Sequence, residues 1–323
     1  MQTKEQVLQR LRVALKLKGR DWKTLNSYAA TAGHFYDFVL TCPRDWSSER
    51  KAEAYLTRRA MVDHVSASTQ NHDLAALNAL YESQGKKLGN VDALRAKRPR
   101  FERHCPSRDE VITLLRQLHD TPDVPARLVA LMLYGIGLRV NESLELRLKD
   151  VRLSESRLVI RAPKHGHDRV VQLPCELHAP LRRQIEHARR VFDLDQARTP
   201  PLALQVPNAL ARKYPRAPHS LGWAFLFPSP RPMRHPESQK LLRWHLPDWT
   251  IQGAFSAACD AAALLARITP HCLRHAYGTH FAGDIRDLQA QLGHKSLETT
   301  QTYRHPHIER IRSPLADLAP ALV

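Results

Sequence analysis

Apolar residues recur at helical spacing through the first part of the chain. A first stripe, with members three or four positions apart, is formed by Val7, Leu8, Leu11 and Leu15. The same period predicts further helices over about 24–40, 54–62 and 69–84. Because no strand-like alternation of apolar and polar residues interrupts them, we predict a small all-helical domain over 1–90.

A second periodic region opens on a helix-start signal. Ser107 is a suitable N-cap, and Glu110 three residues later completes a capping box. The apolar run 126–134 then predicts a buried helix that Gly135 and Gly137 end. We therefore expect this region to begin with two helices.

Strand-like patterning is confined to one short segment. Residues 157–174 contain two β-rich arms around a turn with Lys164 and Gly166, which predicts a hairpin. Helical patterning returns over about 177–191 and again from 250 onward. The predicted fold class is mainly α with a small antiparallel β-sheet.

Composition marks a linker and an insertion. Basic residues crowd 91–105, with Pro99 among them and Pro106 directly after, which favours an interdomain linker that lies along a phosphate backbone over a merely solvated hinge. The linker residues that we expect to contact DNA are Arg98, Arg100 and Arg103. The second domain would then cover 106–323, with a proline- and tryptophan-rich insertion near 198–250.

The charge balance points to a polyanionic partner. The chain has 49 Lys and Arg against 32 Asp and Glu, a formal net charge of +17. A field of that sign attracts nucleic acid. The amphipathic first helix leaves a membrane-surface role open, but we favour a DNA-facing or solvated helix.

Several classes of protein are excluded or disfavoured. No run of 18 apolar residues exists, so we predict no membrane span. The first residues lack the apolar region of a secretory signal. The five cysteines are scattered and form no CxxC motif, which favours reduced thiols in a cytoplasmic protein.

Three local motifs carry candidate chemistry. They are GIGLRVNE at 135–142, PHCLRHAYGTH at 270–280 and LGHKSLETTQTYRH at 292–305. Arg139 follows a glycine-rich break at a predicted helix start, where the backbone would aim its guanidinium at a phosphate. The alternative is a surface arginine paired with Glu142 or Glu145.

The second motif pairs a histidine with an arginine. His271 and Arg274 are three residues apart, so they share one face of a helix. A metal site is the competing interpretation, since His275 and His280 are close in sequence. The histidine pair of a zinc-protease helix encloses a glutamate, but His271 and His275 enclose none. An arginine beside a metal cation is also unfavourable. We predict no metal.

The third motif contains a candidate nucleophile. Gly293 would stop a helix, and His294 would follow at the exposed corner. A tyrosine such as Tyr303 is a poor nucleophile at its free pKa of about 10, so it needs cationic neighbours and a route for its proton. Alone, this tyrosine would be a packing residue. Together, the motifs form a set for phosphoryl transfer that needs no metal.

These motifs resemble the catalytic domain of the tyrosine recombinases, also called phage-integrase-type recombinases. The shared pattern is G-x-G-L-R-x-x-E, H-x-L-R-H, L-G-H and a tyrosine nine residues after that last histidine. The resemblance runs from about 106 to 304, and 1–90 resembles the helical, SAM-like core-binding domain. It implies that the two domains together form a C-shaped DNA clamp.

The resemblance implies a site-specific recombinase that works without cofactor or metal. Tyr303 would attack a DNA phosphodiester and form a 3′-phosphotyrosyl link, while Lys164 protonates the leaving 5′-oxygen. Arg139 and Arg274 would stabilise the charge of the transition state. The position of Lys164 alone, on an exposed hairpin, indicates only a solvated lysine, and Arg169 from the same hairpin is a further candidate DNA contact.

The remaining implied roles concern the histidines and the assembly. His271 would assist deprotonation of the tyrosine, and His294 would bind the scissile phosphate. Recombination joins two sites in a homotetramer on synapsed DNA, with a monomer or weak oligomer when free. A short tail with Leu315, Leu318 and Leu322 would dock on a neighbouring protomer, unless it covers its own core.

The insertion narrows the resemblance to integron integrases. The segments at 209–229 and 236–245 resemble the extra segment of that group, which acts on a double-stranded site and on folded single-stranded hairpin sites of gene cassettes in bacteria. Trp223, Trp244 and His245 are candidates for stacking on extruded bases. Trp223, within an apolar run, is equally consistent with a core residue.

One departure from the family pattern leaves alternatives open. The segment between His280 and His294 is about three residues shorter than is usual, which would shift catalytic groups and weaken activity. A catalytically weakened, sequence-specific DNA-binding protein is therefore the alternative function. A nicking-closing enzyme similar to type IB topoisomerases shares the residue set, but the core-binding half argues against it.

Overall fold

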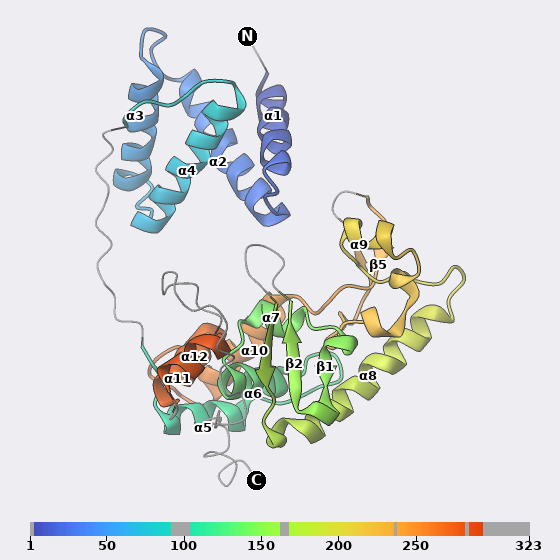
Figure 1. The fold of residues 1–323 in the computed structure, drawn as a ribbon. Helices are drawn as coiled ribbons and strands as arrows, with labels where there is room; N and C mark the ends of the chain where they lie inside the picture. The colour runs from blue at the N-terminus through green and yellow to red at the C-terminus, as the bar shows by residue number, and fades with distance from the viewer. Residues whose placement is uncertain (1–2, 92–103, 162–167, 236–237, 282–283, 293–323) are drawn as a thin grey trace. The chain divides into compact units, whose positions relative to one another are not determined.

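The computed structural model describes residues 3–91, 104–161, 168–235, 238–281 and 284–292 (Figure 1). The chain divides into two compact units, Met1–Glu102 and Arg103–Val323, each with its own apolar core. The boundary falls within the predicted linker. Arg98, Arg100 and Arg103 of that linker lie outside the described residues.

The described residues of the first unit form four helices. Their bounds are α1 Lys4–Leu17, α2 Trp22–Leu40, α3 Ser48–Met61 and α4 Ala67–Ser83. Each begins after a Thr, Asp or Ser whose side chain accepts a hydrogen bond from a backbone N–H in the first turn. Residues of the predicted stripes, such as Leu11 and Phe35, are buried in its core. The predicted helical domain is confirmed, although α3 starts six residues before position 54 because Ser47 caps it.

The described part of the second unit starts with three helices, and the middle one is mostly buried. They are α5 Arg108–Gln117, α6 Ala126–Ile136 and the short α7 Val140–Leu144. The capping box of Ser107 and Glu110 is present. Gly135 lies inside α6, and only Gly137, in the left-handed conformation at φ 71°, ends the helix. The expectation that both glycines end it is wrong at Gly135, because that residue keeps helical geometry in the core.

The hairpin is part of a three-stranded antiparallel sheet. Its strands are β1 Val151–Arg152, β2 Arg157–Ile160 and β3 Arg169–Gln172, in the order β1-β2-β3. Ile160 pairs with Arg169 where the two arms of the hairpin approach the turn. The turn itself, with Lys164, lies outside the described residues. The predicted hairpin is confirmed.

The last helices close the second unit around α6. They are α8 His178–Gln196, α10 Asp248–Ala261, α11 Pro270–His280 and α12 Ile285–Leu292. α11 packs along α6, and α12 packs against β3. Five single turns of 3-10 helix connect the elements: Leu148–Asp150, Leu153–Glu155, Cys175–Leu177, Ala217–His219 and Leu221–Trp223. Mainly helical structure with small antiparallel sheets is therefore confirmed as the fold class.

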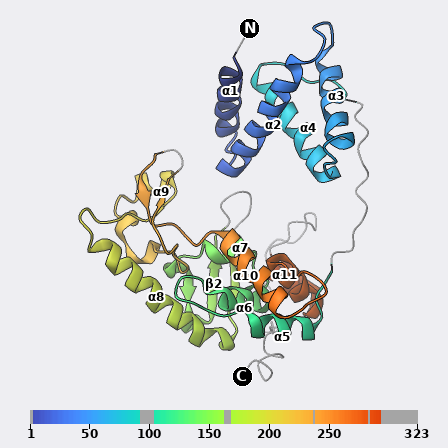
Figure 2. The same ribbon diagram turned by 180° about the vertical axis from the view of Figure 1, so that it is seen from behind.

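The insertion forms a small subdomain at the far end of α8. It contains α9 Asn208–Lys213 and the ribbon of β4 Met233–Arg234 and β5 Leu241–Leu242. Figures 1 and 2 show this subdomain at the end of the second unit opposite α11 and α12. No helix among the described residues has both the length and the apolar character needed to cross a bilayer.

Candidate active site

Gly137 allows three helices to meet at one point. Besides its left-handed backbone, it leaves no room for a side chain, since a Cβ there would lie 2.5 Å from the Tyr277 ring and 2.8 Å from Leu292. Tyr277 belongs to α11, and Leu292 is the last residue of α12. The end of α6 therefore packs directly against both helices, and Arg139 follows two residues later.

Arg139 is the N-cap residue of α7 and bonds to its own first turn. Its backbone N–H donates to Oε2 of Glu142 at 2.8 Å, and its Nη1 donates to Oε1 at 2.7 Å. Its side chain remains 44% exposed. The pairing with Glu142, which the sequence left open, thus coexists with an accessible guanidinium.

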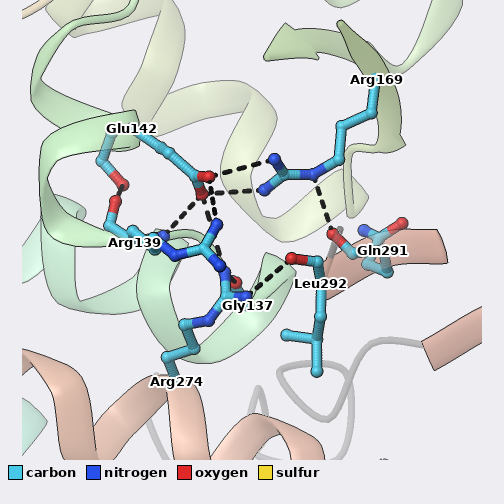
Figure 3. A network of polar contacts seen from close by, with 8 residues as sticks. Gly137, Arg139, Glu142, Arg169, Arg274, Gln291 and Leu292 are labelled. Atoms are coloured by element: carbon cyan, nitrogen blue, oxygen red, sulfur yellow. Dashed lines mark hydrogen bonds and ion pairs between the residues drawn. The ribbon is translucent and has the colours of Figure 1, made fainter. Parts of the chain in front are cut away.

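Arg274 extends from α11 toward the same carboxylate (Figure 3). Nη1 donates to the carbonyl oxygen of Gly137, and Nη2 donates to that of Leu292 at 2.7 Å. The side chain is buried, and Nη1 lies 3.6 Å from Glu142. Burial and the nearby Arg139 lower the pKa of Arg274 to about 10, so the side chain stays cationic at neutral pH. The two predicted arginines therefore lie around one carboxylate.

Arg169 completes the cluster from β3. Its Nη1 and Nη2 donate to the two oxygens of Glu142 at 3.0 and 2.8 Å, and its Nε donates to the carbonyl oxygen of Gln291 at 3.1 Å. Burial opposes ionisation of the Glu142 carboxyl, but its bonds to Arg169 and Arg139 outweigh burial and lower its pKa to about 2. In this structure Arg169 bonds to partners within the site, and the DNA contact predicted for it stays a prediction.

The histidines of α11 have different surroundings. His271 is exposed on the first turn, with its ring centroid 5.7 Å from that of His275, whereas Arg274 is buried. His280 lies at the other end of the helix, where its Nδ1 shares a 3.0 Å hydrogen bond with the hydroxyl of Tyr134. Within the part of the chain that the structure describes, no three His, Cys, Asp or Glu side chains form a metal-binding group.

Lys164, His294 and Tyr303 lie outside the described residues. Lys164 and His294 are close in sequence to β3 and α12, which contribute to the cluster. β3 begins five residues after Lys164, and α12 ends two residues before His294. The roles predicted for these three residues stay predictions.

The aromatic candidates of the insertion differ in their contacts. Nζ of Lys149 lies 2.9 Å from the ring centroid of half-buried Trp223, which favours the packing interpretation of that residue. Trp244, also half-buried, lies against the ring of His235, with 5.8 Å between centroids. His245 packs on Phe225 and is half-buried as well, so the rings of Trp244 and His245 are each only partly accessible.

Sequence reasoning missed a buried ion pair that fastens the insertion. Arg243 of the insertion donates through Nε and Nη2 to the two oxygens of Asp195 on α8, both at 2.6 Å. Neither side chain is more than 6% exposed. A basic residue in a basic segment gives no sign that it is buried, so no pattern in the sequence indicated this contact.

Two buried tyrosines near the site give a paired stability prediction. Tyr277 and Tyr134 are both fully buried, but the Tyr277 hydroxyl has no hydrogen-bond partner among the described residues. An unsatisfied buried hydroxyl costs about 1–3 kcal/mol. Tyr277→Phe should therefore raise the free energy of unfolding by about 1 kcal/mol, measured by urea denaturation.

Tyr134→Phe is the matched control. This change removes the hydrogen bond to His280, so it should lower the free energy of unfolding by roughly 0.5–1.5 kcal/mol. If Tyr277→Phe destabilises the protein as much as Tyr134→Phe does, the Tyr277 hydroxyl has a partner and the expectation is wrong.

Comparisons with known proteins agree with this architecture. A family model described as "Phage integrase family" matches residues 107–310, and "Phage integrase, N-terminal SAM-like domain" matches residues 7–88. An "Integrase/recombinase" of Escherichia coli is 34% identical over 97% of this chain and 94% of its own length. "Tyrosine recombinase XerA" of Pyrococcus furiosus is 25% identical over 93% of this chain and 89% of its own.

Solved structures show the same fold. The Tn1549 transposon integrase, in complex with transposon right end DNA, matches with a TM-score of 0.59 at 16% identity. The match covers 98% of this chain and 99% of that one. At this identity the likeness concerns the fold alone.

Proposed function

Because the chain belongs to the phage integrase family of tyrosine site-specific recombinases, we propose that it breaks and rejoins DNA through a covalent bond to Tyr303. The observation that carries this proposal is the convergence of Arg139 and Arg274 on Glu142. Two guanidiniums from distant parts of the chain lie against one carboxylate, and we propose that a single scissile phosphate contacts both. Such a pair stabilises the negative charge of a phosphoryl-transfer transition state.

Strand cleavage exchanges one ester bond to phosphorus for another. The Tyr303 oxygen attacks the scissile phosphorus, and the bond from phosphorus to the 5′-oxygen breaks. The tyrosine proton passes to His271, and Lys164 gives a proton to the leaving 5′-oxygen. His294 binds a phosphate oxygen. The hydroxyl of a partner strand then attacks the 3′-phosphotyrosine and reverses the chemistry, so neither ATP nor a metal is needed.

The assembly follows from strand exchange. Two double-stranded sites must be held together while four strands are cut and rejoined, which requires four protomers, one for each cut. We propose a homotetramer on synapsed DNA, with the apolar tail of one protomer docked on the next. The expected location is the bacterial cytoplasm, in association with the nucleoid.

Covalent trapping tests the strand-cleavage proposal. The protein is mixed, without divalent metal, with nicked DNA that carries a candidate recombination site, and adducts are separated on denaturing gels. We expect a slower protein–DNA band, and peptide mapping of that band should place the nucleotide on Tyr303. Duplex DNA of the same length and unrelated sequence should give no band.

A second candidate function is a catalytically weakened DNA-binding protein. The observation in its favour is the short connection between α11, which ends at His280, and α12, which begins at Ile285. Against it, Arg274 still reaches the carbonyl oxygen of Leu292 across this connection. Sequence-specific binding in a gel-shift assay without any covalent adduct would favour this second function over the first.

We further propose that the substrates are those of an integron integrase, namely a duplex attachment site and folded hairpin sites of gene cassettes. The support is the subdomain on α8, which has a two-stranded ribbon with exposed Arg234 and a partly accessible aromatic pair, Trp244 and His235. Extruded bases of a hairpin can stack on such rings, at roughly 1–3 kcal/mol per base. A duplex without extruded bases gains nothing from them.

Trp244→Ala should therefore weaken recombination of a hairpin site by about 5- to 100-fold and leave duplex binding nearly unchanged. The assay compares the two substrates at equal enzyme concentration. Trp249→Ala is the matched control, because Trp249 is 68% exposed on α10 outside the ribbon. Equal losses on hairpin and duplex would contradict the assignment of Trp244.

A further inference from the structure

Arg169 is the side chain that connects the separate segments of the active site. It extends from β3, and it bonds to Glu142 of α7 and to the last turn of α12 (Figure 3). Resting on the proposed strand cleavage, we propose that Arg169 is a positioning residue. It keeps Glu142 neutralised and holds the end of α12, so that Arg139 and Arg274 stay in place when they bind the DNA phosphate.

Arg169 and its two partners, Glu142 and Gln291, are each close in sequence to a predicted catalytic residue. Arg169 lies five residues after Lys164 in the hairpin. Glu142 lies three residues after Arg139, and Gln291 lies three residues before His294. α12 packs against β3, so the bond from Arg169 to the Gln291 carbonyl lies at an interface between elements. A change at Arg169 therefore acts on three segments at once.

The last turn of α12 depends on two arginines. The carbonyl oxygen of Gln291 accepts from Arg169, and that of Leu292 accepts from Arg274. These two bonds hold the last described turn of α12 against β3 and α11.

Charge explains why a third arginine is needed. Glu142 is 15% exposed and accepts bonds from Arg139 and Arg169, with Arg274 at 3.6 Å. A phosphate that draws Arg139 and Arg274 toward itself would leave this carboxylate with weaker partners. A buried charge that loses its partner is strongly destabilising. The two-pronged bond from Arg169 keeps Glu142 paired throughout the reaction.

The same contacts argue against a direct DNA contact by Arg169. Its Nη1 and Nη2 form a two-pronged ion pair with the Glu142 carboxylate, whereas Nη1 and Nη2 of Arg274, which is also buried, donate to the neutral carbonyl oxygens of Gly137 and Leu292. To reach DNA phosphate it would have to release Glu142. The two roles predict different responses to salt, because each lost phosphate contact lowers the slope of log K against log salt by about 1.

The test compares Arg169→Gln, Arg169→Lys and the wild type on the covalent-trapping substrate at saturating DNA. We expect Arg169→Gln to slow cleavage by up to about 100-fold, as for a misplaced catalytic group. Arg169→Lys keeps the charge but loses the two-pronged bond to Glu142, so it should cleave faster than Arg169→Gln and more slowly than the wild type. The affinity for DNA and its salt slope should match the wild type. Arg152→Gln is the control, since Arg152 forms an exposed pair with Glu155 in the same sheet.

Two results would overturn the proposal. One is unchanged cleavage by both Arg169 variants. The other is a salt slope lower by about 1, which would make Arg169 a DNA contact. The salt slope is measured on Arg169→Gln, because Arg169→Lys keeps a cation that could still contact a phosphate. If Arg169→Gln does not fold, the double variant Arg169→Gln with Glu142→Gln, which has no unpaired carboxylate, replaces it in this measurement.

A measurement without DNA separates this proposal from the strand-cleavage proposal. Arg169→Gln should lower Tm, and adding Glu142→Gln should restore part of the loss, because the second change removes the unpaired carboxylate. If the wild type forms no adduct but this coupling is present, the strand-cleavage proposal is wrong and the positioning role of Arg169 is supported. If the two changes have independent effects on Tm, the positioning role of Arg169 is wrong whatever the cleavage assay shows.

Discussion

Arg274→Lys is expected to slow formation of the covalent adduct by on the order of 10²–10³-fold, with affinity for DNA changed by less than about threefold. The guanidinium of Arg274 is held by two carbonyl oxygens, Gly137 and Leu292, and points into the cluster around Glu142. A lysine would be cationic as well, but its compact ammonium lacks the planar array of donors that holds both carbonyl oxygens while it faces a phosphate.

The affinity should change little because binding of a long DNA site depends on many phosphate contacts. Stabilisation of the transition state depends on a few preorganised donors. The measurement is a single-turnover rate on nicked DNA, with a gel shift for affinity. Arg267→Lys serves as the control, because Arg267 is 61% exposed and pairs with Asp260 on the surface. A cleavage rate within threefold of the wild type would show that Arg274 does not contact the reacting phosphate.

Asp195→Asn is expected to lower the free energy of unfolding by about 3–5 kcal/mol, the usual cost of breaking a buried ion pair. Asp195 is fully buried on α8, and both of its oxygens accept from Arg243. The substitution removes the charge that balances Arg243, itself 6% exposed, and places an NH2 donor where one of the two acceptor oxygens was. For a unit of this size, the expected shift in Tm is roughly 10 °C.

The effect should be strongly non-additive. Replacing both partners, as Asp195→Leu with Arg243→Met, removes both buried charges, so the double variant should be much more stable than the sum of the single changes predicts. Thermal and urea unfolding of the four proteins measure this. Arg198→Met is the control, since Arg198 is half exposed and 3.5 Å from Asp195; its cost should be below about 1 kcal/mol. Additive losses would mean that the pair does not act as a unit.

The same ion pair separates what the chain pattern predicts from what folding adds. The segment with Arg243 and Trp244 is basic and rich in proline, which predicts that Trp244 is exposed and gives no sign that Arg243 is buried. In the structure Arg243 is buried against Asp195, and only Trp244 next to it is partly accessible. Neighbouring residues on a strand point to opposite sides, and nothing local indicates which side faces α8.

Arg169 shows the same limit within the active site. Its position after the hairpin turn predicts a side chain near DNA, and the fold instead directs it to Glu142 and Gln291. These partners are 27 and 122 residues away in sequence. An ion pair between distant segments depends on how β3, α7 and α12 pack, and no period or spacing in the sequence records that packing.

Local patterns in the sequence are enough to predict the main helices, the hairpin, and the order of motifs that contains Arg139 and Arg274. These features depend on local spacing, on caps such as Ser107 and on the special backbone of Gly137, which neighbouring residues largely dictate. The tertiary structure decided which charges are buried and which partners they have. That is because burial and ion pairing are set by segments that meet only when the core has formed.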